Sequence, residues 1–196
     1  MLIERGADVA AQDKVGETPL HLASRNGEEE VARMLIECGA DVAAQNKDGE
    51  TPLHRASQKG KVEVTRMLIE CGADVSAQTK HGETPLHLAS KRPSYGIQLQ
   101  GLAEVSCILL GRGADVNAKN KDGLTSFCLA SQNRDGRDPR LKVLLDHGAD
   151  LVVYPPLLLS PLRAGRGVST PTLHSHLVGD RKAKALPHVI QAHTLV

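Results

Sequence analysis

The chain repeats itself with a period of 33 residues, and this regularity restricts its possible folds more than any other feature. The tripeptide Gly-Ala-Asp begins at positions 6, 39, 72, 113 and 148, and residues 6–38 and 39–71 are identical at 25 of 33 positions. A fixed period of this length is typical of proteins in which each repeat is one supersecondary unit that packs against its neighbours.

Each period encodes two helices and a turn. The string Thr-Pro-Leu-His begins at Thr18, Thr51 and Thr84. Threonine is an effective N-cap, and proline is well tolerated at the first helical position. A second helix follows over residues 30–36 in one copy, and we expect its apolar face to contain Val31, Met34 and Leu35. The glycine of each Gly-Ala-Asp then ends this helix.

The pattern Gly-Glu-Thr-Pro-Leu-His-x-Ala-Ser, followed by Met-Leu-Ile-Glu-x-Gly-Ala-Asp-Val, resembles the ankyrin repeat. The resemblance covers residues 1–150 and implies an all-α solenoid of helix–turn–helix units with short β-hairpin loops. We expect a partial repeat at 1–15 and repeats at about 16–48, 49–81, 82–122 and 123–150. In this family the histidine of Thr-Pro-Leu-His supports hydrogen bonds within and between repeats, which implies a structural role for His21, His54 and His87.

The third and fourth repeats depart from the pattern. The third is eight residues longer, and the excess falls between Lys91 and Glu104, within or around the segment from Pro93 to Gly101. This segment is either a tolerated loop or a binding surface in which Tyr95 is the attractive contact residue. In the fourth repeat Ser126, Phe127 and Cys128 replace Pro, Leu and His. We expect the loss of that histidine to loosen the repeat, while Asp138 and Pro139 still begin its second helix.

The two ends of the chain lead to separate expectations. Residues 1–6 align with 34–39, so the chain starts inside the second helix of a repeat. This favours a fragment of a larger protein, and the alternative is a short protein with a frayed end. Residues 151–196 hold five of the ten prolines and a single acidic residue, Asp180. We expect a disordered tail; the alternative is that residues 157–159 fold over the end of the array.

Composition and motifs indicate binding rather than catalysis. A net charge of +1 disfavours a nucleic-acid binder, and no apolar stretch approaches the ~20 residues that span a bilayer. Cys38 and Cys71 lie one repeat apart, about 10 Å, which is too far for a disulfide. No cysteine pair has zinc-ligand spacing, and no phosphate-binding loop or nucleophile elbow is present. We therefore expect a monomeric, cytoplasmic protein (nuclear as the alternative) that is not an enzyme and binds no cofactor, metal, nucleic acid or membrane.

The family resemblance places the expected protein-binding surface at the loop tips and at the ends of the first helices. The tip positions are Lys14, Val15, Glu17, Lys47, Asp48, Glu50, Lys80, His81, Glu83, Lys121, Asp122 and Leu124. The helix-end positions are Arg25, Asn26, Gln58, Lys59, Lys91, Arg92, Gln132 and Asn133, and Arg55 lies on the inner helix.

Lysine recurs at one position of every loop, and this indicates a partner with acidic groups along an extended face. The glutamates at 17, 50 and 83 partly offset that charge. The leading interpretation is a protein–protein interaction module. The alternative is a stand-alone regulatory subunit or assembly chaperone made only of ankyrin repeats.

Overall fold

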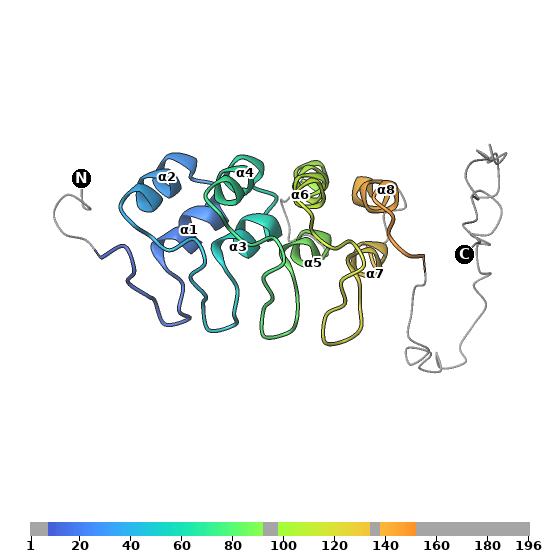
Figure 1. Ribbon diagram of the computed structural model, residues 1–196, viewed down its shortest axis with the longest axis horizontal. Coiled ribbons are helices and arrows are strands. Elements are labelled where there is room, and N and C mark those ends of the chain that lie inside the picture. The colour runs from blue at the N-terminus through green and yellow to red at the C-terminus, as the bar shows by residue number, and fades with distance from the viewer. Residues whose placement is uncertain (1–7, 92–97, 134–137, 152–196) are drawn as a thin grey trace, which may run out of the picture. The chain divides into compact units, whose positions relative to one another are not determined.

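The computed structural model describes residues 8–91, 98–133 and 138–151, all within one compact unit that spans residues 1–158. Tyr95, Arg92 and the tail from residue 152 lie outside the described residues. Figure 1 shows helix pairs stacked side by side, with odd-numbered helices in one layer and even-numbered helices in the other. The pairs are α1 (Pro19–Asn26) with α2 (Glu29–Glu37), α3 (Pro52–Gln58) with α4 (Val62–Glu70), α5 (Pro85–Ser90) with α6 (Leu99–Gly111), and α7 (Ser126–Ser131) with α8 (Pro139–Asp146).

The first helix of each pair begins as the Thr-Pro pattern predicts. Thr18, at the N-cap of α1, has extended backbone and is followed by proline at the first helical position. Its backbone N–H donates to His21 Nδ1 at 3.2 Å, and its hydroxyl lies 2.8 Å from the same nitrogen. Thr51 with His54 and Thr84 with His87 repeat these contacts. A polar group that would be unpaired at a helix start is therefore satisfied in each repeat.

The second nitrogen of each histidine ring joins one repeat to the next. His21 Nε2 lies 2.9 Å from the carbonyl oxygen of Glu50, and His54 Nε2 lies 3.0 Å from that of Glu83. His87 Nε2 makes the corresponding bond to Leu124 at 3.1 Å. In the fourth repeat the Thr125 hydroxyl donates to Cys128 Sγ at 3.3 Å. The Cys128 side chain has a single polar atom, the sulfur that faces Thr125, so it cannot make the second bond that joins one repeat to the next.

The core consists of aliphatic side chains in repeated layers. Leu20, Leu53 and Leu86 occupy equivalent positions and are each 0% exposed. In α2 the buried residues are Ala32 and Leu35, whereas Val31 is 38% exposed, so the predicted apolar face was wrong at Val31. The equivalent residue of α4, Val64, is 1% exposed. The difference arises because α4 packs between α2 and α6, whereas α2 contacts α4 as its one neighbour among the described even-numbered helices. Leu145 of α8, which its spacing from Leu141 and Leu144 predicts to share their apolar face, is likewise exposed.

The last residues of the inserted segment, Leu99 to Gly101, belong to a helix, and residues 92–97 lie outside the described residues. Helix α6 has 13 residues, whereas α2 and α4 have 9 each, and it begins at Leu99, inside the segment that the sequence treats as a loop. The extra turn of α6 lies against the end of α3. A Cβ atom at Gly101 would be 2.9 Å from the carbonyl oxygen of Gly60. Glycine at position 101 therefore permits the two backbones to approach.

The projecting loops resemble hairpins only in part. Each loop closes on itself, as the bond from Asn46 N–H to the Glu50 carbonyl at 3.0 Å shows. Adjacent loops are joined by single bonds, such as Lys47 N–H to Val15 and Lys80 N–H to Asp48. The described residues contain no β-strand. One bond per junction is too few to build the regular ladder of a sheet.

A buried ion pair fastens the last helix pair to the array. Arg140 of α8 is fully buried, and its Nε donates to Asp138 Oδ1 at 2.9 Å. Its Nη1 donates to the carbonyl oxygens of Ala89, at 2.8 Å, and of Lys91, at 2.7 Å. These are carbonyls at the end of α5, which the helix itself leaves unpaired. Asp138 also caps α8, as expected.

We predict that Arg140→Ala lowers the free energy of unfolding by about 3–5 kcal/mol, because it leaves the Asp138 carboxylate buried without a cation. Urea unfolding followed by circular dichroism measures the change. Arg66→Ala is the control, since Arg66 forms only an exposed pair with Glu63 at 3.9 Å and should cost at most about 1 kcal/mol. Equal effects of the two substitutions would contradict the prediction.

We also predict that the protein loses stability as the pH falls below about 6.5, the ordinary histidine pKa. Burial removes His21, His54 and His87 from water and thereby lowers the pKa of each ring, although the carbonyl that each ring meets partly opposes this. The unfolded chain then binds protons that the folded chain excludes, so the free energy of unfolding falls by up to about 1.4 kcal/mol per pH unit and histidine.

Urea unfolding at a series of pH values from about 7 to about 5 measures this dependence. His81→Gln, at an exposed loop position, should leave the profile unchanged. A free energy of unfolding that does not vary across this range would show that the three buried rings do not exclude protons.

Candidate functional site

The four loops carry one lysine each along the same edge of the stack. Figure 1 shows the loops projecting on the side of the odd-numbered helices, away from α2, α4, α6 and α8. The side chains are exposed and occupy equivalent positions; they are Lys14, Lys47, Lys80 and Lys121. We call these four residues the lysine edge. The backbone bonds between adjacent loops hold its members in order.

Two of the glutamates expected at the loop tips are buried behind the edge. Glu17 is 3% exposed and contacts Arg25 Nη1 at 3.1 Å through Oε2, while Arg55 Nη2 contacts its other oxygen. Arg55 also reaches Glu50 Oε2 at 3.1 Å. Placing Glu17 at an exposed tip was wrong, because Arg25 and Arg55, which the sequence assigned to the binding surface, hold its carboxylate in the interior. Glu50, in contrast, is only partly buried. Glu83, 8% exposed, is held in the same way by a contact of 2.7 Å with Lys91.

The lysine edge, in contrast, is not neutralised by such pairs. Within residues 8–91, 98–133 and 138–151, no carboxylate oxygen lies within 4.0 Å of the ammonium groups of the lysine edge, of Lys59 or of Lys61. Lys47 Nζ donates instead to the backbone carbonyl of Lys14 at 2.7 Å. Positive charge on this face is therefore available to an external partner.

The other expected contact residues differ in accessibility. Val15 is 50% exposed, and Asp48, His81 and Asp122 are exposed beside the lysines. Leu124 and Gln58 are partly buried. Asn26 is exposed and donates to Glu28 at 3.2 Å, whereas Asn133 donates to the buried carboxylate of Asp138 at 3.1 Å.

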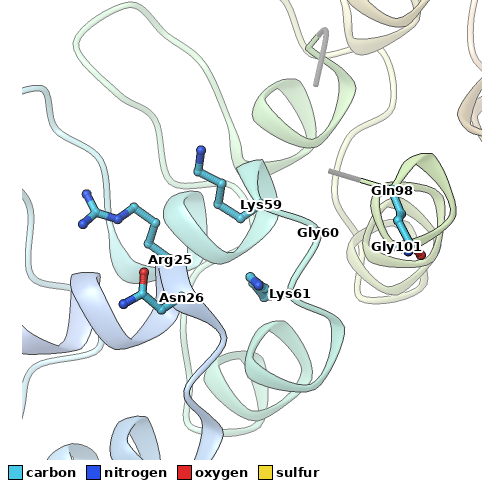
Figure 2. A pocket seen from close by; sticks show the side chains of 7 residues that line it. All are labelled: Arg25, Asn26, Lys59, Gly60, Lys61, Gln98 and Gly101. Carbon is cyan, nitrogen blue, oxygen red and sulfur yellow. The ribbon is translucent and has the colours of Figure 1, made fainter. Parts of the chain in front are cut away.

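An open groove of about 920 Å³ is lined by residues of the first, second and third repeats. Its lining comes from the end of α1, the turn between α3 and α4, and the first turn of α6; the residues are Arg25, Asn26, Lys59, Gly60, Lys61, Gln98 and Gly101. Figure 2 shows Arg25, Asn26 and Lys59 on one side, Gln98 and Gly101 on the other, and Lys61 between them. We call these residues the basic groove.

Sequence reasoning placed only part of this groove. Arg25, Asn26 and Lys59 were expected as helix-end contacts, and Gln98 and Gly101 lie in the inserted segment that was one candidate binding surface, but Lys61 was not expected. Lys61 replaces the glutamate found at position 28 of the preceding repeat, a reversal of charge that the alignment of the two repeats displays. The position of Gln98 could not be read from the sequence, because it depends on the inserted residues extending α6.

The described part of the chain shows no arrangement that suggests chemistry at a metal. It contains no group of three histidine, cysteine, aspartate or glutamate side chains that could hold a metal ion. Its helices are also too short or too polar to cross a membrane. The three histidines of the repeats are fully buried, and both nitrogens of each ring are engaged in the contacts described above.

Stacked helix pairs with an exposed charged edge define a helical repeat protein whose surface suits a macromolecular partner. The family model for ankyrin repeats, which comprises three copies, matches the chain over residues 1–79 and again over 38–120. This chain therefore belongs to the ankyrin repeat family, whose repeats are protein–protein interaction modules. No curated protein is significantly similar to the chain.

We predict that Arg55→Leu lowers the free energy of unfolding by about 1.5–3 kcal/mol, because it removes one of the two cations that hold the buried Glu17. Leucine occupies this position in the neighbouring repeats, so its size is compatible with the helix. The control is Arg33→Leu, which removes an exposed pair with Glu29 and should cost less than about 1 kcal/mol. Chemical denaturation of both variants tests the difference, and an unchanged Arg55→Leu protein would contradict the assigned role.

Proposed function

We propose that this chain is a non-catalytic scaffold that binds an acidic segment of a partner protein along the lysine edge. The observation that carries the proposal is the column of exposed ammonium groups at Lys14, Lys47, Lys80 and Lys121, which have no acidic partner among the described residues. A row of like charges raises the local concentration of acidic groups and speeds their association.

The charge distribution supports this proposal better than the net charge would suggest. The chain as a whole has a net charge of +1. The arginines of the inner helices and Lys91 are paired with buried carboxylates. The loop tips therefore present the four lysines to solvent beside the exposed carboxylates of Asp13, Asp48 and Asp122, which form no ion pair with them among the described residues.

A scaffold of this kind serves equally as a module within a larger protein or as a stand-alone regulatory subunit. In both settings the binding energy comes from side chains on a rigid, repeated surface, and no reacting group is required. A regulatory subunit would be expected to stay bound to one partner through purification, whereas an interaction module would exchange among partners.

We predict that changing Lys14, Lys80 and Lys121 to Glu abolishes retention of the partner in affinity capture with the full chain, whereas the outer-layer variant Arg33, Arg66 and Lys142 to Glu retains it. Both variants change the net charge equally, and the three control residues are exposed on α2, α4 and α8. Lys47 is left intact because its side chain bonds the preceding loop. Quantitative mass spectrometry of the captured proteins compares the two.

Salt provides an independent check of the same proposal. Raising the ionic strength from low to physiological values should weaken capture, since exposed charges are screened beyond about 8–10 Å. Capture that is insensitive to salt, or that is lost equally in both variants, would rule out the lysine edge as the binding surface.

A further inference from the structure

The basic groove gathers three cations from three separate elements. Arg25 is in the last turn of α1, Lys59 follows α3, and Lys61 precedes α4. All three residues are partly buried, and the described residues that line the groove include no carboxylate. Like charges that are brought together in a partly buried site repel one another more strongly than in water. An anion that enters the groove would therefore reduce the electrostatic repulsion among the three cations.

The aliphatic stem of Lys61 packs against Gly27. A Cβ atom at Gly27 would lie 2.7 Å from Lys61 Cδ and 3.3 Å from Lys61 Nζ, so the lysine stem lies across this glycine. Gly27 has a φ of 80° and ends α1, where the helix carries partial negative charge. A cation whose stem is already ordered loses less entropy when it binds a ligand.

The opposite wall exists only because of the insertion in the third repeat. The extra turn of α6 brings Gln98 and Gly101 next to Gly60, where Gly101 allows the close approach. Gln98 adds an amide that can hydrogen-bond a carboxylate or a peptide group, as can Asn26. At the equivalent positions the preceding repeat has Glu28 and the following repeat has Leu102 in place of Lys61. A lysine at this position is therefore found in the second repeat and in neither of its neighbours.

The size of the groove indicates what kind of anion it receives. Its volume of about 920 Å³ is near the upper end of the range for ligand sites, about 300–1,000 Å³. A single phosphate or sulfate would leave most of it empty. An extended peptide that presents acidic side chains to the three cations and its backbone to the two amides would use both walls.

We propose that the basic groove binds a short acidic peptide segment of the partner, through carboxylate side chains placed between Arg25, Lys59 and Lys61. The inference rests on the proposed scaffold function and adds a second, localised contact to it. Of the three cations, Arg25 is shared with Glu17, so Lys59 and Lys61 are the pair that remains for the ligand.

The test uses the full chain and a fluorescent peptide that alternates Glu with Gly and Ser, with Gln in place of Glu as the neutral reference. Fluorescence anisotropy measures the affinity. We expect the double variant Lys59→Glu with Lys61→Glu to weaken peptide binding at least about tenfold, equivalent to about 1.4 kcal/mol. The double variant Lys14→Glu with Lys80→Glu, which changes the charge equally on the lysine edge, should also weaken binding of the acidic peptide, but by a smaller factor than the groove variant.

A further variant, Gln98→Glu, places a carboxylate on the opposite wall. It should weaken peptide binding while keeping the thermal stability, because an acidic residue is favourable at the start of α6. If the Lys59→Glu and Lys61→Glu variant does not fold, Gln98→Glu still tests whether charge in the groove controls peptide binding.

Each outcome bears on the proposal. If only the lysine-edge variant weakens binding, the groove inference fails and the scaffold proposal stands. If neither variant weakens binding, or the Gln peptide binds equally well, both fail. If inorganic phosphate displaces the peptide where chloride of equal ionic strength does not, the groove is a small-anion site and the peptide assignment is wrong.

Discussion

Stacking of the repeats depends on a buried imidazole that is bonded at both nitrogens. In each of the first three repeats one nitrogen meets the capping threonine and the other meets a carbonyl oxygen of the next loop. The ring is shielded from water, so losing it would leave a carbonyl and an N–H unpaired in the interior, which is costly. The same bond fixes where the next loop lies, and the order of the lysine edge follows from it.

The fold separates two sets of charges that are mixed along the chain. Glu17 and Glu83 turn inward and pair with the cations of the inner helices and with Lys91. A buried carboxylate requires such pairing. The lysines of the loop tips are left without acidic partners, although glutamate follows closely behind three of them in the sequence. Binding through charge therefore arises from burial of the acids as much as from the presence of lysine.

The repeat pattern was sufficient to predict the helix pairs, their starts at Thr-Pro and the structural histidines, since these depend on local sequence and on one repeated contact. It failed at Val31, whose exposure depends on what lies beside α2. It also failed at Leu99 to Gly101, which were expected in a loop but form the first turn of α6. The buried Arg140 went unnoticed because its partners at the end of α5 lie about fifty residues earlier in the chain.

The sequence by itself determined the period, the solenoid and the equivalent positions of the four edge lysines, because backbone capping and aliphatic spacing act within one repeat. Only the tertiary structure decided which charges are free and where a groove opens. Pairing of Glu17 with Arg25 and Arg55 requires side chains from two repeats to meet. The basic groove requires three, since the extra turn of α6 in one repeat must reach Gly60 in another and face the end of α1 in a third.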